Sequence, residues 1–144
     1  MASKFNIDDK SAETLDDYFY LIYMDKIENQ WPLDRLVFVD KYPPYQAALA
    51  RIDQQGWAER FEVYWNGLEL ANAFHELNDP VIQRQRSNED IVKRKQFGFR
   101  DIDLDESFFQ ALEKGMPPSS GVALGLERLF MALKGIKNIQ EIKS

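Results

Sequence analysis

The stretch that decides the fold is RFEVYWNGLELANAFHE, residues 60–76. Apolar and polar side chains alternate on both sides of Asn66-Gly67, a strong signal for a two-residue β-turn because both residue types tolerate a positive φ. We therefore predict a β-hairpin with strands at 60–65 and 68–76. One of its faces is expected to carry an apolar stripe that packs in the core: Phe61, Val63, Trp65, Leu68 and Leu70.

The two-residue turn also sets the register of the hairpin. It places Tyr64 opposite Glu69, and an uninterrupted ladder would place Glu62 opposite Ala71. Glu62 and Glu69 then become diagonal neighbours on the face away from the apolar stripe, with backbones roughly 7–8 Å apart. Two carboxylates at that spacing can bind one hard divalent cation, which predicts a metal site at the hairpin.

The alternation of the second strand fails near Ala71. Beyond it, Asn72, Phe74 and Glu76 continue the parity of the apolar stripe, although two of them are polar. A β-bulge near Ala71 would return these three residues to the face of Glu69. That face would then suit a cationic ligand, a divalent metal ion or both. From the hairpin alone, an acidic strand face that only keeps the sheet soluble is the favoured interpretation of the same residues.

Capping signals and helical spacing define the elements outside the hairpin. Thr14 and Asp17 form a capping box, and Asp79 and Asp105 are expected to cap two later helices. In chain order we predict a helix at 14–29, a buried strand at 36–39, a short helix at 44–53, a polar surface helix from Pro80, a short helix carrying Phe108, Ala111 and Leu112, a strand at 122–124, a helix at 127–134 and a last turn with Ile139 and Ile142. This order predicts one α+β domain over 1–144, an antiparallel β-sheet flanked by helices, with a tail and helix at 1–31.

Composition limits the classes of function. The 144 residues are 44% hydrophobic and 13% aromatic, as in one globular domain, and the net charge of −6 argues against nonspecific binding to nucleic acid or to an anionic membrane. There is no cysteine, and His75 is the one histidine, which we expect to be structural. Thiol nucleophiles, thiolate zinc sites and metal sites with two histidine ligands are therefore excluded. With neither a membrane span nor a signal peptide evident, we expect a soluble, cytoplasmic protein.

A second candidate site lies at the segment GVALGLER, residues 121–128. It places two glycines in a strand and Arg128 at the start of a helix. Glycine in a strand often marks the close approach of a ligand, and Arg128 can lay its guanidinium on an aromatic base while Gly125 leaves room beneath. Tight packing at the glycines, with Arg128 on a solvated face, is the alternative interpretation.

Three ordered blocks, 59–62, 69–77 and 121–128, together resemble the C-terminal half of the catalytic domain of class II lysyl-tRNA synthetases. They are more similar still to the paralogues that lysylate elongation factor P, which share a Gly-Met-Pro-x-x-Ser-Gly-Val-Ala-Leu-Gly segment with residues 115–125. The resemblance extends from about Leu36 to the C-terminus. It implies a partial class II synthetase fold.

The resemblance also implies roles for individual residues in binding ATP and Mg²⁺. Glu62 and Glu69 would hold Mg²⁺ on the ATP phosphates. Gly125 would underlie the adenine, and Arg128 would stack on it while contacting phosphate. The reaction implied is attack of a lysine carboxylate on the α-phosphate, which gives an aminoacyl-adenylate and pyrophosphate.

The same resemblance implies an amino-acid pocket. Asn72, Phe74 and Glu76 would line it, with Glu76 pairing with the side-chain ammonium of lysine. Ala71 stands where synthetases usually have glycine and would reshape the pocket near the α-amino group, which in the paralogues accompanies a preference for β-lysine. The acceptor would be elongation factor P or a tRNA.

The departures from the family pattern weaken the case for independent catalysis. The first two class II signatures are absent, and the second supplies an Arg-x-Glu that grips the α-phosphate. Half of the sheet would then be missing, so we expect self-association or a partner that supplies the other half of the active site. A non-catalytic module that binds nucleotide or a cationic amino acid, or that serves in assembly, is the alternative function, and a gene remnant is a third possibility.

Overall fold

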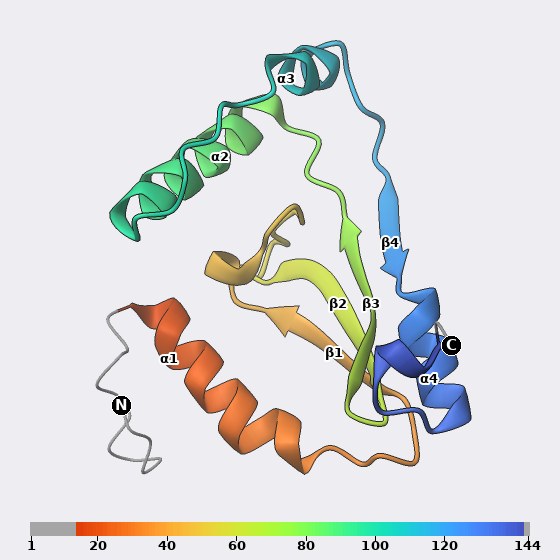
Figure 1. Ribbon diagram of the computed structural model, residues 1–144. Coiled ribbons are helices and arrows are strands. Elements are labelled where there is room, and N and C mark those ends of the chain that lie inside the picture. The colour runs from red at the N-terminus through yellow and green to blue at the C-terminus, as the bar shows by residue number, and fades with distance from the viewer. Residues whose placement is uncertain (1–13, 143–144) are drawn as a thin grey trace.

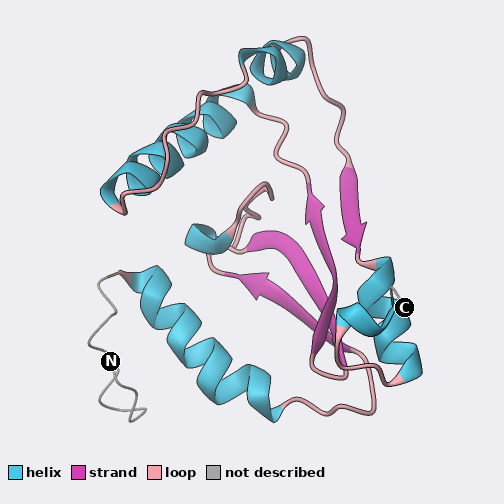
Figure 2. Ribbon diagram, viewed as in Figure 1, coloured by secondary structure: helices cyan, strands magenta, loops and turns pink. Residues whose placement is uncertain are grey.

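The computed structural model describes residues 14–142, which form a four-stranded antiparallel sheet with helices around it (Figures 1 and 2). The strands lie in the order β1 (Val37–Tyr42), β2 (Ala58–Trp65), β3 (Leu68–His75) and β4 (Ser120–Leu124). The α-helices are α1 (Leu15–Ile22), α2 (Pro80–Gln96), α3 (Glu106–Glu113) and α4 (Leu126–Lys134). The α+β class with an antiparallel sheet is confirmed. Residues 1–13 of the predicted N-terminal tail lie outside the described range.

The helices occupy separate places around the sheet. Helix α1 runs along one side, α4 lies near the hairpin turn, and α2 and α3 form an arm beyond the opposite ends of β3 and β4 (Figure 1). Arg84 joins the two helices of the arm, because it donates twice to Glu106 at 2.8 Å and lies 4.1 Å from the ring centroid of Phe109. No helix within residues 14–142 combines the length and the apolar character that a membrane span requires.

The hairpin contains the predicted bulge. The β2–β3 register pairs Trp65 with Leu68, Tyr64 with Glu69, Val63 with Ala71, Glu62 with Asn72, Phe61 with Ala73 and Arg60 with Phe74. Leu70 is the extra residue, one position before the site expected, so the pairing of Glu62 with Ala71 is wrong. Asn72 and Phe74 thereby share a face with Glu62, which we call the front face. The back face carries Val63 and Ala71.

Aromatic side chains of the N-terminal segment cover part of the front face. The capping box is confirmed, since Asp17 N–H donates to the Thr14 hydroxyl at 3.2 Å and Thr14 N–H donates to the Asp17 carboxylate at 2.8 Å. The expected helix at 14–29 continues from α1 as a π-helical turn at Tyr23–Ile27 and a 3₁₀ turn at Glu28–Gln30. Trp31 then packs edge-on against Tyr64, with ring centroids 4.5 Å apart.

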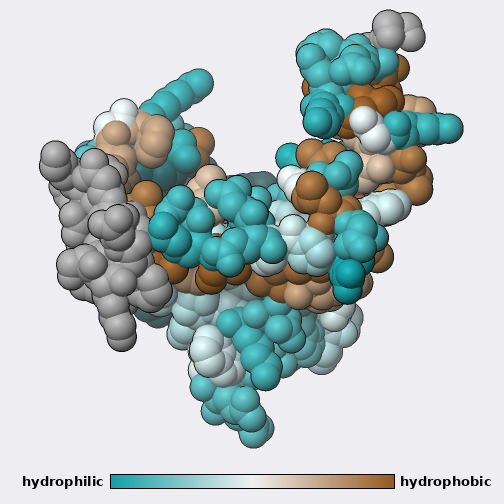
Figure 3. Space-filling model, turned by 90° about the horizontal axis from the view of Figure 1, so that it is seen from below, coloured by the Kyte–Doolittle hydropathy of each residue, from teal (hydrophilic) through white to brown (hydrophobic). Residues whose placement is uncertain are grey.

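The expectation that the apolar stripe forms the core is wrong for Phe61, which is exposed, whereas Arg60 and Tyr64 on the front face are buried. The strand at 36–39 was expected to be buried, but β1 is an edge strand of the described sheet, and Phe38 is 63% exposed. The physical reason is that the N-terminal aromatic side chains cover the front face and leave the back face open. Figure 3 shows apolar side chains at the surface between polar ones.

The helix expected at 44–53 is also wrong. Only Pro44–Gln46 form a 3₁₀ turn. The chain then becomes extended because Ala50 forms a β-bridge with Glu76 and Arg51 N–H donates to the His75 carbonyl at 2.9 Å. These bonds use the backbone groups that a helix would need.

The remaining elements follow the prediction closely. Asp79 caps α2, Asp105 caps α3, and α4 ends at Gly135, whose φ of +68° is the left-handed conformation of a C-terminal glycine. The last turn is a 3₁₀ helix at Ile139–Ile142. In α3, however, the buried ring is Phe109, not Phe108.

This difference in α3 predicts a difference in stability between two neighbouring substitutions. Phe109 is 2% exposed and Phe108 44% exposed. We expect Phe109→Ala to lower the free energy of unfolding by about 3–5 kcal/mol, because it leaves a cavity under Arg84. Phe108→Ala serves as the matched control, with an expected loss under about 1 kcal/mol. Urea unfolding followed by circular dichroism measures both, and equal losses would contradict the packing described.

Candidate active site

The centre of the front face is the carboxylate of Glu62. Its side chain is 13% exposed and lies in the middle of β2. One oxygen, Oε2, accepts hydrogen bonds from the hydroxyls of Tyr42 and Tyr64, each at 2.7 Å. The other, Oε1, forms an ion pair with the guanidinium of Arg60 and accepts from Asn72 Nδ2 at 3.5 Å. The negative charge is therefore fully partnered by donors from three strands.

Arg60 is held from several sides at once. Its side chain is 7% exposed, and Nη1 donates to the Gln46 carbonyl at 2.8 Å while Nη2 reaches Asn72 Oδ1 at 3.3 Å. The guanidinium carbon lies 4.3 Å from the ring centroid of Tyr42 and 5.4 Å from that of Phe74. Its Nε is buried without a hydrogen-bond partner. Arg60 thus connects Glu62 with Asn72 and Phe74, two candidate pocket residues.

Burial keeps the tyrosine hydroxyls of this cluster protonated. It is the main cause that raises the pKa of Tyr42 and Tyr64 well above the usual value near 10, and the hydrogen bonds to Glu62 add to the effect. The Tyr23 hydroxyl lies 3.3 Å from that of Tyr42, and burial raises its pKa as well. The three phenols therefore act as hydrogen-bond donors throughout the physiological range.

Glu69 and Arg128 meet at the junction of the hairpin and α4. Arg128 Nη1 donates to the Glu69 carbonyl at 3.0 Å and lies 3.5 Å from its carboxylate. Gly125 fixes this junction, because its N–H donates to the Leu70 carbonyl at 2.9 Å. A Cβ at Gly125 would meet only the side chain of Arg128, at 3.5–3.6 Å. The structure therefore brings Arg128 and Gly125 beside Glu69.

Glu62 and Glu69 line one cavity of about 210 Å³, and no hydrogen bond joins their side chains. Its other walls are Phe19, Tyr20, Tyr23, Met24, Glu28, Tyr42, Gln46 and Tyr64. Within residues 14–142, no three histidine or acidic side chains gather closely enough to hold a metal ion alone. Two carboxylates do fit Mg²⁺ when phosphate oxygens and water complete its shell, which is its usual coordination with nucleotides.

The candidate amino-acid pocket follows β3 toward its end. Asn72 and Phe74 lie on the front face, and Glu76 follows two residues later. The carboxylate of Glu76 lies against Gly121 of β4, so closely that a Cβ there would be 2.5 Å from Glu76 Oε1. The Glu76 backbone is fixed, because its carbonyl accepts from Arg51 Nε at 3.0 Å. The three side chains thus form a row along one strand.

Two residues from the sequence prediction lie elsewhere. Ala71 is buried on the back face, where it pairs with Val63 and Leu124, so its methyl group points away from Glu62. His75 Nδ1 lies 2.7 Å from a carboxylate oxygen of Glu59, which is the partner that a structural histidine needs.

Sequence reasoning missed Arg60, Tyr42 and Tyr64. For Arg60 and Tyr64 a signal existed, since they lie two residues on either side of Glu62 and must share its face. Tyr42 comes from another strand, and nothing in the local sequence marks it.

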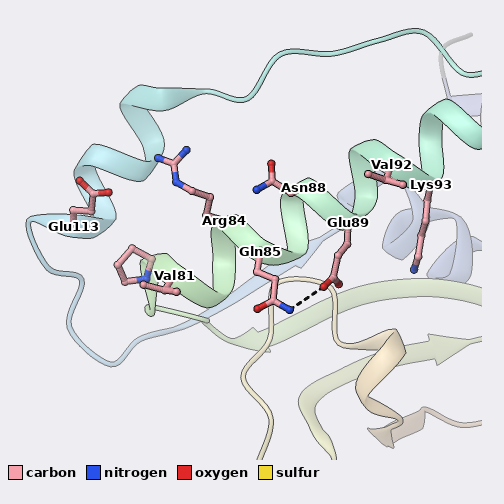
Figure 4. Close-up of a pocket in the computed structure, with 9 residues that line it drawn as sticks. Val81, Arg84, Gln85, Asn88, Glu89, Val92, Lys93 and Glu113 are labelled. Carbon is pink, nitrogen blue, oxygen red and sulfur yellow. Dashed lines mark hydrogen bonds between the residues drawn. The ribbon is translucent and has the colours of Figure 1, made fainter.

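A larger cavity of about 930 Å³ runs along α2 and is lined by Val81, Arg84 and Val92 among others (Figure 4). It contains none of the candidate site residues.

Comparison with known proteins places these features in a family. A family model described as tRNA synthetases class II (D, K and N) matches residues 12–144. Three curated relatives are named elongation factor P–(R)-β-lysine ligase. The relative from Hamiltonella defensa subsp. Acyrthosiphon pisum is 43% identical, and the match covers 88% of this chain and 40% of the relative. The relative from Edwardsiella ictaluri is also 43% identical, with 92% of this chain and 41% of the relative covered. The relative from Vibrio parahaemolyticus is 40% identical, with 98% of this chain and 45% of the relative covered. The chain therefore spans less than half the length of these relatives.

The raised pKa values of the clustered tyrosines predict a distinctive alkaline titration. The folded state favours the neutral phenols, so this contribution to stability is fully present below about pH 10 and is lost as the pH rises further. Of the six tyrosines, we expect Tyr42 and Tyr64 to ionise only as the chain unfolds. Absorbance at 295 nm, recorded with circular dichroism, would show a late phase that Tyr42→Phe and Tyr64→Phe each reduce. A single transition near pH 10 in the folded chain would contradict the cluster.

Proposed function

This chain belongs to the class II tRNA synthetases of the D, K and N group, and from that membership we propose that it supplies one half of an active site that activates lysine or β-lysine with ATP. The observation that carries the proposal is that Glu62 and Glu69 line one cavity next to the Asn72–Glu76 row, with Arg128 beside Glu69. Identity of about 40% to ligases named for elongation factor P and (R)-β-lysine supports β-lysine as the substrate and elongation factor P as the acceptor. Lysine and tRNA are the alternatives.

In this proposal the ATP side of the site lies around the β4–α4 junction. Gly125 gives the adenine room, and the exposed Arg128 stacks on it and contacts phosphate. Glu62 and Glu69 hold Mg²⁺, which neutralises phosphate charge when it is bound. Arg128 already lies beside Glu69, so these two side chains are placed to meet one nucleotide.

The amino-acid side lies along β3. Glu76 pairs with the side-chain ammonium, while Asn72 and Phe74 form the walls. Asn72 Oδ1 accepts from Arg60 and Asn72 Nδ2 donates to Glu62 Oε1, which leaves the second hydrogen of the NH₂ group to donate to a ligand oxygen. Because the Ala71 methyl group lies on the back face, we propose that Ala71 shapes the pocket through the path of the backbone at the bulge.

The chemistry that these residues serve is the formation of an adenylate. A carboxylate oxygen of the amino acid attacks the α-phosphorus of ATP, the bond to the bridging β-phosphate oxygen breaks, and pyrophosphate leaves. Positioning and neutralisation of charge supply the catalysis, which agrees with a site that holds carboxylates, an amide and arginines. The acyl group then passes to the acceptor.

We further propose that the rest of the site comes from a second copy of the chain or from a partner. Several apolar side chains on or beside the sheet are exposed in the described structure: Phe38, Phe61, Val122 and Leu124. Contiguous apolar surface of this kind is normally covered by another protein segment. The relatives are more than twice as long as the stretch they share with this chain, which supports a missing half.

A non-catalytic binding module is the second candidate function. The observation that favours it is that Glu62 is already fully hydrogen-bonded within the chain, while aromatic side chains line the cavity beside it. Such a chain would bind nucleotide or a cationic amino acid and release neither pyrophosphate nor adenylate.

Pyrophosphate exchange and ligand binding distinguish these two functions. We expect Mg·ATP to bind the chain in calorimetry and Arg128→Ala to weaken binding at least about tenfold, since a phosphate contact is lost. Lys134→Ala, in the last turn of the same helix, is the control and should change binding less than twofold.

Lysine- or β-lysine-dependent exchange of pyrophosphate into ATP is then measured with and without the N-terminal portion of the Vibrio parahaemolyticus relative. Exchange that requires both pieces and is lost in Arg128→Ala supports the half-site. Binding without exchange under either condition supports the module. Absence of binding by Mg·ATP and by lysine or β-lysine would refute both.

Substitutions of Gly121 and Gly125 by alanine are expected to have opposite effects on the binding of lysine or β-lysine and of Mg·ATP. In Gly121→Ala the new methyl group must push the Glu76 carboxylate aside, so we expect lysine or β-lysine to bind at least about tenfold more weakly, with Mg·ATP affected less than twofold. In Gly125→Ala the methyl group fills the space under the proposed adenine, and the pattern should reverse. Each variant thus controls for the other in calorimetric titrations. Equal effects on both ligands would contradict the assignment of the two pockets.

A further inference from the structure

We propose that the guanidinium of Arg60 is the resident counter-ion of Glu62 and that a divalent cation must take its place at Glu62 Oε1. The inference rests on the proposed metal role of Glu62 and Glu69, and it assigns a regulating function to a residue outside that pair. It follows from how the two oxygens of Glu62 are used in the described structure.

The oxygen Oε2 is not available to a cation. The hydroxyls of Tyr42 and Tyr64 both donate to it at 2.7 Å. Displacing them would leave two buried O–H groups without an acceptor, which is costly. A cation that binds Glu62 therefore has to approach Oε1.

The oxygen Oε1 is occupied by a group that can leave. Arg60 pairs with it, but the guanidinium also donates to the Gln46 carbonyl and to Asn72 Oδ1. It rests on the ring of Tyr42 as well. When Nη2 moves away from Oε1, Nη1 keeps the Gln46 carbonyl and the guanidinium keeps the ring of Tyr42, so the displacement does not strand a buried cation.

Charge balance explains why the cation has to replace Arg60 at Glu62 Oε1 and cannot bind beside it. Glu62 and Arg60 cancel each other inside a site of low exposure, and a divalent ion beside an unmoved guanidinium would meet a like charge at close range. The ion and Arg60 therefore compete for one oxygen. A cation has to overcome Arg60 before it binds, which makes the free chain a weak cation binder despite its net charge of −6.

The competition is testable without nucleotide, amino acid or catalysis. Tb³⁺ replaces hard divalent cations at oxygen sites and emits when nearby tyrosines are excited, and Tyr42 and Tyr64 adjoin the site. The emission lost in Glu69→Gln, whose side chain is partly exposed, defines the specific signal. We expect Arg60→Gln to bind Tb³⁺ at least about tenfold more tightly than the wild-type chain, because the competing charge is gone.

Matched variants separate local competition from general electrostatics and from misfolding. Arg35→Gln removes the same charge from an exposed side chain and should change the affinity less than twofold. A disrupted fold lowers affinity, so it cannot imitate the gain expected in Arg60→Gln. Should Arg60→Gln not fold, the Arg60 Nε–H resonance of the wild-type chain, assigned by its loss in Arg60→Lys, should move when diamagnetic La³⁺ is added and not move in Glu69→Gln.

Three results would overturn the inference: affinity in Arg60→Gln equal to or below wild type with the fold intact, a gain of equal size in Arg35→Gln, or an Arg60 resonance unmoved by La³⁺. An unchanged Tb³⁺ signal in Glu69→Gln would remove its premise. Failure of Mg·ATP to bind, by contrast, would refute the proposed function and leave the Tb³⁺ comparison intact, so the two failures are distinguishable.

Discussion

The fold depends on the burial of one carboxylate. A charge as buried as that of Glu62 costs several kcal/mol unless hydrogen bonds and an opposite charge compensate it. The donors come from β1 through Tyr42, from β2 through Arg60 and Tyr64, and from β3 through Asn72. This requirement constrains the register, because Asn72 faces Glu62 only when the bulge at Leu70 advances β3 by one residue. Without the bulge an alanine would stand opposite Glu62, and the front face of the hairpin would lose both its amide and the ring of Phe74.

The same network explains why the sheet buries its polar face. Aromatic side chains from the N-terminal segment pack over the tyrosines that hold Glu62, as the contact of Trp31 with Tyr64 shows. The back face keeps large apolar side chains at the surface, among them Phe38 and Phe61, whose ring centroids lie 6.1 Å apart. A sheet with a partly covered polar face and exposed apolar side chains on the other face is the arrangement expected of a fold that continues in another polypeptide segment.

Local sequence signals predicted the elements but not the network. Asn66-Gly67, the capping residues Thr14 and Asp79, and Gly135 all act on their immediate neighbours, and each element that they define is present. The bulge was predictable because a break in period 2 is visible within one strand. The helix expected at 44–53 failed because β-bridges between distant segments, such as Ala50 with Glu76, outweighed local propensity. The roles of Tyr42 and Arg60 depend on contacts between side chains of different strands, which a short stretch of sequence does not reveal. Phe109, not Phe108, packs under the guanidinium of Arg84, a residue of another helix, so the local sequence of α3 does not reveal this contact either.

The distribution of arginines shows what the front face lacks for catalysis. Arg60 is buried and committed to Glu62, whereas Arg128 is half exposed and lies beside Glu69. Of these two, Arg128 is therefore the one placed to meet a phosphate in the proposed site, and a guanidinium in contact with water stabilises developing charge far less than one in a closed site. Efficient attack on an α-phosphate needs further donors and the exclusion of water around Arg128. In the proposed half-site, a further protein segment beside Arg128 supplies both. The exposed apolar side chains of the back face need a cover of their own, so the proposal requires protein on both faces of the sheet.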